Sequence, residues 1–271
     1  MKNWKWENNF GIPFITIPAW RQKGVEIAFT TRRGGFSSVP YHSLNLGLHV
    51  GDKQENVINN RQQLLKIFGG HLNQMVCCQQ VHGNIVKVVE KSHSGSGAKE
   101  YGTALEGIDG MICNTAGIFL TTFYADCLPV YLFDPIEMAI GIAHSGWKGT
   151  IKRIAGNMVA KMAEQYSSRP ENLQVFFGPG IGACCFEIQS DLVQKVNAEF
   201  GHIDDIIIRD ERGYKWDLIE TNRIILRQEG IKPENIYVCD ICTSCNPEIF
   251  YSYRSEKGKT GRMGAIMGLR N

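Results

Sequence analysis

The sequence predicts a mixed α+β fold in which a mixed β-sheet is flanked by helices. Segments typical of strands are more numerous than helical segments, and the two kinds do not alternate strictly. Strict alternation is typical of a doubly wound parallel sheet, so its absence favours the mixed arrangement. The chain has no internal repeat and no linker-like stretch, so we expect residues 1–271 to form a single domain.

The predicted strands are short segments rich in β-branched or aromatic residues. They are Glu26–Thr30, Met75–Cys78, Ile85–Glu90, Ile118–Tyr124, Pro129–Phe133, Met138–Ala143, Leu173–Phe177 and Ile236–Cys239.

Four helices are predicted, of which the first two lie between these strands. Asp52 and Glu55 form a capping-box pattern before a helix that ends near Phe68, with Gly69 as its stop. The second is expected as one continuous helix, because its apolar residues recur at helical spacing. Those residues are Trp147, Ile151, Ile154, Met158 and Met162.

The other two predicted helices lie in the C-terminal half. Asp217 and Glu220 cap the start of one, which Gly230 and Pro233 close. The other covers the region near Ser190–Phe200.

The overall composition indicates an ordinary globular protein. Hydrophobic residues make up 43% of the chain and charged residues 21%, and the net charge is +2. Because no basic or acidic run is present, nothing points to nucleic acid or to a membrane surface. No apolar segment follows residues 1–9, and the longest apolar stretches have the length of strands, so we expect a cytoplasmic protein.

The nine cysteines indicate reduced thiols. Their number is odd and includes two adjacent pairs, which does not suit a disulfide framework. Cys239, Cys242 and Cys245 resemble half of a zinc knuckle, but no second pair of cysteines or histidines lies at the usual spacing. We therefore interpret them as buried thiols.

Reactive side chains follow three of the predicted strands. His144 ends an apolar strand just before a helix, whose free N–H groups suit an anion, and Lys148 adds a positive charge. Asp126 and Cys127 follow the strand that ends at Tyr124. His82 follows another strand-like segment in a His-Gly turn.

His82, Cys127 and His144 are predicted to converge on one metal ion. Two imidazoles and a thiolate are a suitable set for Zn²⁺, and Cu²⁺ is also possible with these ligands. Three protein ligands leave a fourth position open, as in catalytic sites. Each residue taken alone is more often part of a core or a surface, and a metal-free pair of Cys127 as nucleophile and His144 as base remains an alternative.

Two further features have plain structural interpretations. The segment Gly178–Gly182 matches no nucleotide-binding pattern and is interpreted as a tight turn that brings the backbone close to the site. Arg32, Arg33, Arg254 and Arg262 are candidates for binding anions, although a solvated surface position is the more frequent role of a single arginine.

Eight segments in this order resemble the laccase-domain family, also called YfiH-like or polyphenol-oxidase-like proteins. They are Phe29–Gly35, Ser43–Gly47, Gln80–Gly83, Asp109–Gly110, Ala125–Val130, His144–Gly149, Gly178–Ile181 and Phe250–Arg254. The resemblance covers nearly the whole chain. One departure is minor: Tyr253 stands where some members have His. The Cys242-Thr243 element is kept.

The resemblance implies an enzyme that acts on purine nucleosides. Members phosphorolyse adenosine, inosine, guanosine and methylthioadenosine, and deaminate adenosine. By motif, the implied metal ligands are His82, Cys127 and His144, within a single mixed α/β domain. A true multicopper oxidase is not expected, because the chain has seven histidines and no His-x-His pair. A copper-dependent phenol oxidase working at one metal site remains an alternative activity.

On this hypothesis the substrates are a purine nucleoside and phosphate. Arg32, Lys148 and the helix N-terminus after His144 are predicted to hold phosphate, with Asn45 and Arg254 as further binding residues.

Cys127, Arg32 and a carboxylate are the predicted catalytic residues. In deamination, Asp126 or Asp109 would transfer protons while a metal-held water attacks C6 of adenine. Asp109 is equally consistent with capping the turn before Gly110, and Asp126 with binding a loop amide.

Overall fold

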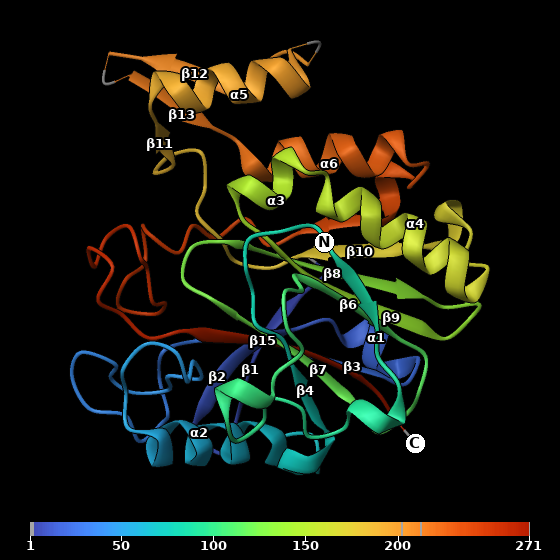
Figure 1. Cartoon of the computed structure of the whole chain (residues 1–271), viewed down its shortest axis with the longest axis vertical. Helices are drawn as coiled ribbons and strands as arrows, with labels where there is room; N and C mark the ends of the chain where they lie inside the picture. The colour runs from blue at the N-terminus through green and yellow to red at the C-terminus, as the bar shows by residue number, and fades with distance from the viewer. Residues whose placement is uncertain (1–2, 202, 212, 271) are drawn as a thin grey trace.

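The computed structural model describes residues 3–201, 203–211 and 213–270 and has four main layers (Figure 1). Helix α2 (Gln54–Lys66) covers one six-stranded sheet, and a second six-stranded sheet packs on the other side of the first. Helices α3 (Trp147–Ile151), α4 (Ile154–Tyr166) and α6 (Leu218–Gln228) cover the second sheet. The predicted mixed α/β architecture is therefore confirmed, with two large sheets where one was expected.

The first sheet has the strand order β1-β2-β3-β15-β7-β4. Its strands are β1 (Lys5–Asn9), β2 (Ile12–Thr16), β3 (Val25–Thr30), β15 (Met263–Leu269), β7 (Phe119–Tyr124) and β4 (Met75–Cys77). β4 and β7 are parallel and the other neighbours are antiparallel. β15 thus joins two groups of strands that are far earlier in the chain.

The second sheet has the strand order β14-β10-β8-β9-β6-β5. Its strands are β14 (Ile236–Val238), β10 (Gln174–Phe177), β8 (Leu128–Asp134), β9 (Ala139–Ser145), β6 (Gly110–Cys113) and β5 (Val86–Val88). The two outer pairs are parallel and the central strands antiparallel. The register of β8 and β9 sets Pro129 opposite His144, so the loop that carries Cys127 lies beside His144.

Each layer boundary buries its own hydrophobic cluster. The cluster between the two sheets contains Phe29 and Leu120 from the first sheet, with Tyr131 and Phe176 from the second. The clusters outside the sheets pack α2 against the first sheet and α4 and α6 against the second. The central strands of both sheets are thus covered on both faces, which explains why they are buried along their whole length, unlike the edge strands β1 and β5.

A smaller unit projects from the helical side of the second sheet, at the top of Figure 1. It contains a three-stranded sheet of order β11-β13-β12 and helix α5 (Ser190–Phe200). The strands are β11 (Glu187–Ile188), β12 (Ile207–Asp210) and β13 (Gly213–Trp216). The remaining elements are helix α1 (Pro18–Gln22) and the 3₁₀ turns Leu72–Gln74, Lys91–His93, Tyr101–Thr103, Pro170–Asn172 and Pro233–Asn235.

The single helix predicted from Trp147 to Met162 is wrong. The chain leaves the helix at Lys152, and Arg153 adopts a left-handed conformation with φ of 56° before α4 begins. The Arg153 guanidinium bonds to Glu199 and Gln228, so contacts with α5 and α6 support the break. The apolar periodicity survives because both halves pack on the same sheet.

The capping box predicted at Asp52 is also wrong. Helix α2 begins at Gln54, and its N-cap residue Lys53 makes no side-chain cap. The Asp52 carboxylate instead accepts hydrogen bonds from Asn45 Nδ2 and from the Lys53 amide. The cap predicted for α6 is confirmed, since Asp217 Oδ1 accepts from the Glu220 amide at 2.8 Å.

All eight predicted strands are present, with small changes at their ends. The most important strand that the sequence did not predict is β15. Its two glycines weaken the strand signal, yet both are required by close packing. A Cβ on Gly264 would lie 2.6 Å from Leu46 Cδ1, and one on Gly268 would lie 2.6 Å from Phe119 Cδ1.

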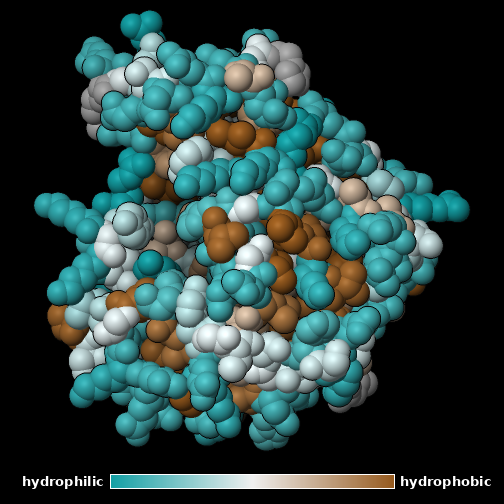
Figure 2. All heavy atoms as spheres, viewed as in Figure 1, coloured by the Kyte–Doolittle hydropathy of each residue, from teal (hydrophilic) through white to brown (hydrophobic). Residues whose placement is uncertain are grey.

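The surface is mainly hydrophilic on the face shown in Figure 2, with hydrophobic side chains gathered across the middle. Among the described residues, no helix has both the length and the apolar composition needed to cross a bilayer. Residues 1, 2, 202, 212 and 271 lie outside the described part, including both ends of the domain predicted over residues 1–271.

Candidate functional site

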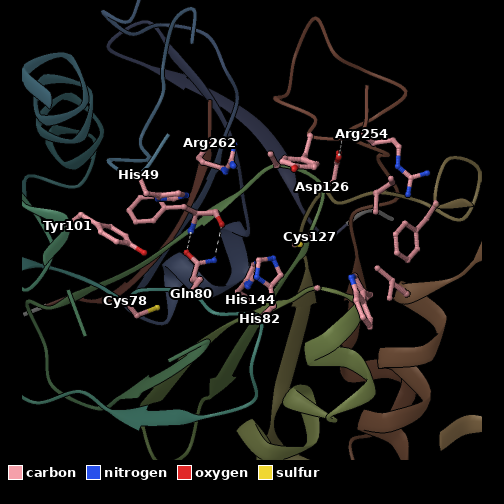
Figure 3. Close-up of a pocket in the computed structure, with 18 residues that line it drawn as sticks. His49, Cys78, Gln80, His82, Tyr101, Asp126, Cys127, His144, Arg254 and Arg262 are labelled. Carbon is pink, nitrogen blue, oxygen red and sulfur yellow. Dashed lines mark hydrogen bonds between the residues drawn. The ribbon is translucent and has the colours of Figure 1, made fainter. Parts of the chain in front are cut away.

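A cavity of about 470 Å³ opens where the loops of the two large sheets meet (Figure 3). It combines several aromatic and apolar walls with imidazole, thiol, carboxylate and guanidinium groups. Its lining residues are His49, Cys78, Gln80, His82, Tyr101, Phe123, Ala125, Asp126, Cys127, His144, Gly146, Trp147, Ile181, Phe186, Leu218, Tyr253, Arg254 and Arg262. This volume lies within the range of small-molecule binding sites.

The structure brings His82, Cys127 and His144 together at this cavity. Their potential ligand atoms all lie within 4.8 Å of one another. The two imidazole rings have centroids 4.8 Å apart and an interplanar angle of 75°, so they approach edge to face. The three residues come from different loops and strands: the pairing of β8 with β9 sets Cys127 beside His144, and the loop after β4 of the other sheet brings His82 to them.

His144 is fixed by Asp109. The His144 amide donates to the Asp109 carbonyl oxygen, and its Nδ1 lies 2.8 Å from Asp109 Oδ1. Burial alone raises the pKa of the Asp109 carboxyl, but His144 and the amides of Val81 and Gly83 lower it below its ordinary value. With Asp109 ionised, Nδ1 carries a proton and donates, so Nε2 is the nitrogen that would bind a metal once the metal displaces its proton.

Asp109 also shapes the turn that carries His82. Its carboxylate accepts from the amides of Val81, His82 and Gly83 at 3.1, 3.0 and 2.6 Å. His82 has a φ of 58°, a left-handed conformation that is uncommon for residues other than glycine. The three amide bonds hold this backbone in place, and Asp109 thereby positions two of the three candidate ligands.

Gly146 gives the cluster the space it needs. A Cβ at this position would lie 2.9 Å from Cys127 Sγ and 3.1 Å from His82 Cδ2. The backbone of residue 146 therefore approaches two candidate ligands too closely for any side chain.

Cys127 and His144 shift one another's ionisation in the metal-free state. Burial alone raises the pKa of the Cys127 thiol, but His144 and hydrogen bonds from both imidazoles lower it to about 6. Burial alone lowers the pKa of His144, but the Cys127 thiolate and Asp109 raise it to about 9. At neutral pH the pair is a thiolate beside an imidazolium, and a metal ion replaces the imidazolium proton as the partner of the thiolate.

This donor set fits a metal ion. Two imidazole nitrogens and one thiolate converge, an oriented carboxylate lies behind one imidazole, and the remaining side of the cluster faces the cavity. These are the features of catalytic zinc sites with one open position. Copper accepts the same donors, so the arrangement does not select between the two metals.

Asp126 borders the cavity, but its two oxygens are already used. Oδ1 accepts from Thr243 Oγ1 at 2.7 Å, and Oδ2 accepts from Ser252 Oγ at 3.0 Å and from the Arg254 amide at 2.7 Å. Asp126, the neighbour of Cys127 in the chain, therefore holds the loop that carries Arg254 in place. This agrees with the loop-amide interpretation of Asp126, as the bonds of Asp109 agree with a role in holding a turn.

The predicted binding residues occupy different places. Arg254 lines the cavity, with its guanidinium bonded to the carbonyl oxygens of Cys185 and Glu187. Lys148 is exposed, does not line the cavity, and lies over the Trp147 ring at 5.4 Å. Asn45 is buried behind the wall, where its Oδ1 accepts from the Arg262 amide at 2.9 Å.

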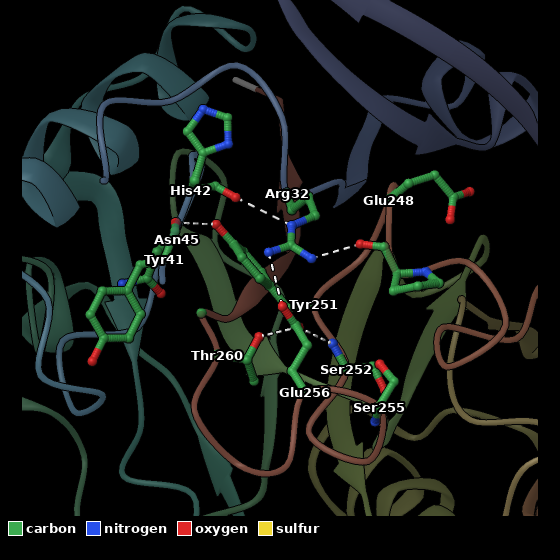
Figure 4. A network of polar contacts seen from close by, with 12 residues as sticks. Arg32, Tyr41, His42, Asn45, Glu248, Tyr251, Ser252, Ser255, Glu256 and Thr260 are labelled. Atoms are coloured by element: carbon green, nitrogen blue, oxygen red, sulfur yellow. Dashed lines mark hydrogen bonds and ion pairs between the residues drawn. The ribbon is translucent and has the colours of Figure 1, made fainter. Parts of the chain in front are cut away.

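The structure does not bring Arg32 to the cavity (Figure 4). Its guanidinium donates to the carbonyl oxygens of His42 and Pro247, pairs with Glu256 at 3.0 Å and lies over the Tyr251 ring. Its hydrogen bonds are used to join loops distant in sequence. Arg32 is therefore a structural hub in this arrangement, and its predicted contact with phosphate is not supported by its position.

Arg262 and His49 are the cavity residues that sequence reasoning undervalued. Arg262 was only one of several anion candidates, yet its largely buried guanidinium borders the cavity. It bonds to the carbonyl oxygens of Thr260 and Gly261, and no Asp or Glu in the described part of the chain forms an ion pair with it. Burial, Arg262 and Arg61 lower the pKa of His49 to about 4, so this imidazole is neutral.

A second cluster lies next to the cavity wall and was not predicted. Cys184, Cys185, Cys242 and Cys245 have sulfur atoms within 4.8 Å of one another. The interpretation of buried thiols is correct for Cys239 and wrong for Cys242, which is half-buried, and Cys245, which is exposed. The segment Gly178–Gly182 does bring the backbone close to the site, because the Ile181 amide donates to the Asp126 carbonyl oxygen at 2.7 Å, but it bends only at Pro179 and forms no tight turn.

Comparison with known proteins extends the resemblance over most of the chain. A family described as multi-copper polyphenol oxidoreductase laccase matches residues 26–270. The chain is 38% identical over 262 residues to purine nucleoside phosphorylase YlmD of Bacillus subtilis, covering 94% of each chain. It is 39% identical over 249 residues to the YlmD of Geobacillus stearothermophilus, covering 91% of each. The crystal structure of that YlmD aligns over 100% of both chains with a TM-score of 0.94 and 36% identity.

Proposed function

Because the chain belongs to the multi-copper polyphenol oxidoreductase laccase family, with relatives named purine nucleoside phosphorylases, we propose that it phosphorolyses purine nucleosides. The substrates are adenosine, inosine, guanosine and methylthioadenosine, and adenosine deamination is a second activity. The observation that carries the proposal is a single cavity that joins a metal-binding donor set, aromatic walls and a half-buried arginine that has no ion pair with an Asp or Glu of the described residues. The nine free thiols suit the reducing cytoplasm, where we place the reaction.

The aromatic walls of the cavity are suited to binding a purine base. Tyr101, Phe123, Trp147, Phe186 and Tyr253 all line it, and flat aromatic surfaces stack well on a base. Phe123 is held in place by Gln80, whose side chain bonds to both the amide and the carbonyl oxygen of that residue. The wall facing the donor set is therefore rigid.

Arg262 is the proposed phosphate-binding residue, in place of Arg32 and Lys148. A half-buried guanidinium at a cavity, bonded to carbonyl oxygens but to no carboxylate, keeps its positive charge available to an anion. Neutral His49 beside it adds a hydrogen-bonding group without a competing charge. Arg254 lies on the opposite wall and remains a candidate for contact with the sugar or the phosphate.

Zn²⁺, or alternatively Cu²⁺, bound by His82, Cys127 and His144 would supply Lewis acidity towards a substrate oxygen or nitrogen. Asp109 keeps His144 in the tautomer that presents Nε2 and keeps the His82 turn in its left-handed form. Both carboxylates have their oxygens bonded, so Asp109 and Asp126 act by positioning neighbouring groups and not by transferring protons.

The experiment supplies purified protein with adenosine and phosphate, and measures ribose 1-phosphate, adenine and inosine. We expect all three products from the zinc-loaded protein and loss of them in His82→Ala, while His71→Ala, which changes an exposed histidine remote from the cavity, retains activity. Unchanged turnover in metal-free His82→Ala would contradict the metal mechanism.

Two rival activities give different results in the same assay. Oxygen uptake with phenols, dependent on added copper, would indicate a phenol oxidase. Inactivation by alkylation of Cys127, with no effect of a chelator, would indicate a cysteine hydrolase that uses His144 as base.

Arg262→Ala tests the phosphate site. We expect the KM for phosphate to rise on the order of 10- to 100-fold, because a charge-assisted hydrogen bond contributes about 1.5–3 kcal/mol. The matched control is Lys148→Ala, which removes an exposed charge outside the cavity and should change that KM by less than about twofold. A larger rise of the KM for phosphate in Lys148→Ala than in Arg262→Ala would contradict this proposal and indicate that phosphate binds at the helix N-terminus after His144.

A further inference from the structure

We propose that Cys184, Cys185, Cys242 and Cys245 bind a second metal ion, a structural Zn²⁺ held by four thiolates. This site is separate from the proposed reaction, since none of its four residues lines the cavity. The proposal for this site does not depend on the proposed nucleoside activity.

The sulfur positions suit one tetrahedral ion. All four lie within 4.8 Å of one another, and Cys245 Sγ is 3.5 Å from Cys184 Sγ and 3.3 Å from Cys185 Sγ. Zn–S bonds of about 2.3 Å in a tetrahedron separate the sulfurs by about 3.8 Å, so small movements complete the site. The observed separations are far longer than a disulfide bond of about 2.0 Å.

The loop from Cys242 to Cys245 has the cysteine spacing of a metal-binding knuckle. Its two cysteines are separated by two residues, the spacing found in many structural zinc sites. The Gly182 amide donates to Cys242 Sγ at 3.2 Å, a bond that stabilises sulfur in its thiolate form.

The second pair of ligands comes from a turn that Gly182 also closes. The amides of Cys185 and Phe186 both donate to the Gly182 carbonyl oxygen at 3.0 Å, which folds the chain back towards Cys242. Cys184 and Cys245 are exposed, so burial of apolar surface does not explain why four thiols meet here. Metal binding does explain it.

The position of the cluster indicates what the ion stabilises. Its two loops follow β10 and β14, which are parallel neighbours, and the Thr243 amide donates to the Gly180 carbonyl oxygen at 3.0 Å. The smaller unit begins just after this point, at β11. One ion at this junction would join the base of that unit to the end of the second sheet.

The same junction forms part of the cavity wall. Ile181 and Phe186 flank the cysteine pair and line the cavity, and Arg254 Nη1 donates to the Cys185 carbonyl oxygen at 3.1 Å. The thiolate site therefore acts as a positioning element for this wall and takes no part in contact with substrate.

The test uses the full-length His82→Ala variant, which removes one ligand of the cavity site. Protein purified under reducing conditions with zinc is analysed for bound metal by native mass spectrometry and elemental analysis. We expect one Zn²⁺ per chain, lost when Cys245→Ser is added and retained when Cys239→Ala is added. Cys239 is the matched control because it lies in the same segment but is buried outside the cluster.

X-ray absorption at the zinc edge on folded His82→Ala protein makes the test independent of whether the cysteine variants fold. Four sulfur neighbours at about 2.3 Å are expected. Absence of zinc, an ion with nitrogen or oxygen neighbours, iron in place of zinc, or an intact mass showing a disulfide within the cluster would each overturn the proposal.

Discussion

The two clusters of candidate metal ligands differ in donors, support and surroundings. His82, Cys127 and His144 offer two nitrogens and one sulfur at the cavity, and Asp109 orients two of these residues from behind. Cys184, Cys185, Cys242 and Cys245 offer four sulfurs outside the cavity, supported by a backbone amide. Three donors leave a position for substrate, whereas four donors complete a tetrahedron.

This difference shows that a short distance between potential ligand atoms does not by itself indicate what a metal site does. Both clusters satisfy the same distance criterion, since their atoms lie within 4.8 Å of one another. The number of donors, the groups behind them and access from the cavity distinguish a site suited to chemistry from one suited to stabilising a junction.

The largest expected difference between the clusters comes from adding one methyl group beside each of them. Gly146→Ala places a Cβ 2.9 Å from Cys127 Sγ, while Gly182→Ala places one 3.3 Å from Cys184 Sγ. We expect Gly146→Ala to lower phosphorolysis on the order of 1,000-fold, because several kcal/mol of metal-dependent stabilisation would be lost. Turnover with adenosine and phosphate, together with metal content, measures this.

Gly182→Ala is the matched control for that substitution. Its Cβ would lie 3.3 Å from Cys184 Sγ and 3.4 Å from Cys242 Cβ, beside a cluster that does not line the cavity, so activity should stay within about threefold of the original. Equal losses in the two variants would show that the clusters do not differ in function.

Thiol reactivity distinguishes the clusters in metal-free protein. The pKa of Cys127 is lowered to about 6, whereas hydrogen bonds with Cys185 and Cys242, and to a lesser extent burial, raise that of Cys245 to about 11. Because the thiolate is the nucleophile, alkylation of Cys127 should rise with pH, reach half its plateau near pH 6 and level off above it. At pH 7 its thiolate fraction is roughly 100-fold that of a thiol of pKa 9.

Iodoacetamide labelling at a series of pH values, with mass spectrometry of the labelled peptides, provides the measurement. His144→Ala removes the positive charge and should move the midpoint for Cys127 towards its ordinary value near 9. A midpoint that stays near 6 in that variant would show that His144 is not the cause.

Asp109→Asn and Asp126→Asn compare the carboxylate behind the ligands with the one behind the cavity wall. Asp109→Asn should lower metal affinity about 10- to 100-fold, as is usual when the partner of a metal-binding histidine is lost. Asp126→Asn should preserve metal binding and raise the KM for nucleoside, because it loosens the loop that holds Arg254. Competition with a chelator and steady-state kinetics separate the two outcomes.

A result in which Asp126→Asn releases the metal would place that residue among the groups that support the cluster. Thermal unfolding of both variants serves as the control, since each leaves buried donors with a poorer acceptor at a cost of about 1–3 kcal/mol.

The three candidate ligands were expected from strand-end positions together with family motifs, and not from any one local signal. Cys127 and His144 stand beside strand ends, His82 lies in a bend between β4 and β5, and the pairing of β8 with β9 brings the first two together. Arg32 and Lys148 were chosen by charge and neighbourhood alone. The Arg32 guanidinium donates to loop carbonyl oxygens, including that of Pro247, which is far away in the sequence. No local sequence pattern reveals such a contact, so the sequence could not show that Arg32 does not line the cavity.

The four-cysteine cluster could not be predicted from spacing. Cys184 and Cys185 are far from Cys242 in sequence, and only the parallel pairing of β10 and β14 brings their loops together. The break at Arg153 has a similar origin, since its bonding partners are Glu199 of α5 and Gln228, the last residue of α6. Apolar periodicity reports the buried face of a helix but not an interruption that preserves that face.

The position of β15 has a consequence for the order in which the protein is made. β3 and β7 leave the ribosome early, but each gains its shared neighbour only after residues 125–262 have followed. Until then the nascent chain carries two half-sheets with open edges, the kind of surface that joins other chains. Protection during synthesis is therefore needed most by this sheet, and changes within Met263–Leu269 should reduce the yield of folded protein more than any other strand replacement of equal size.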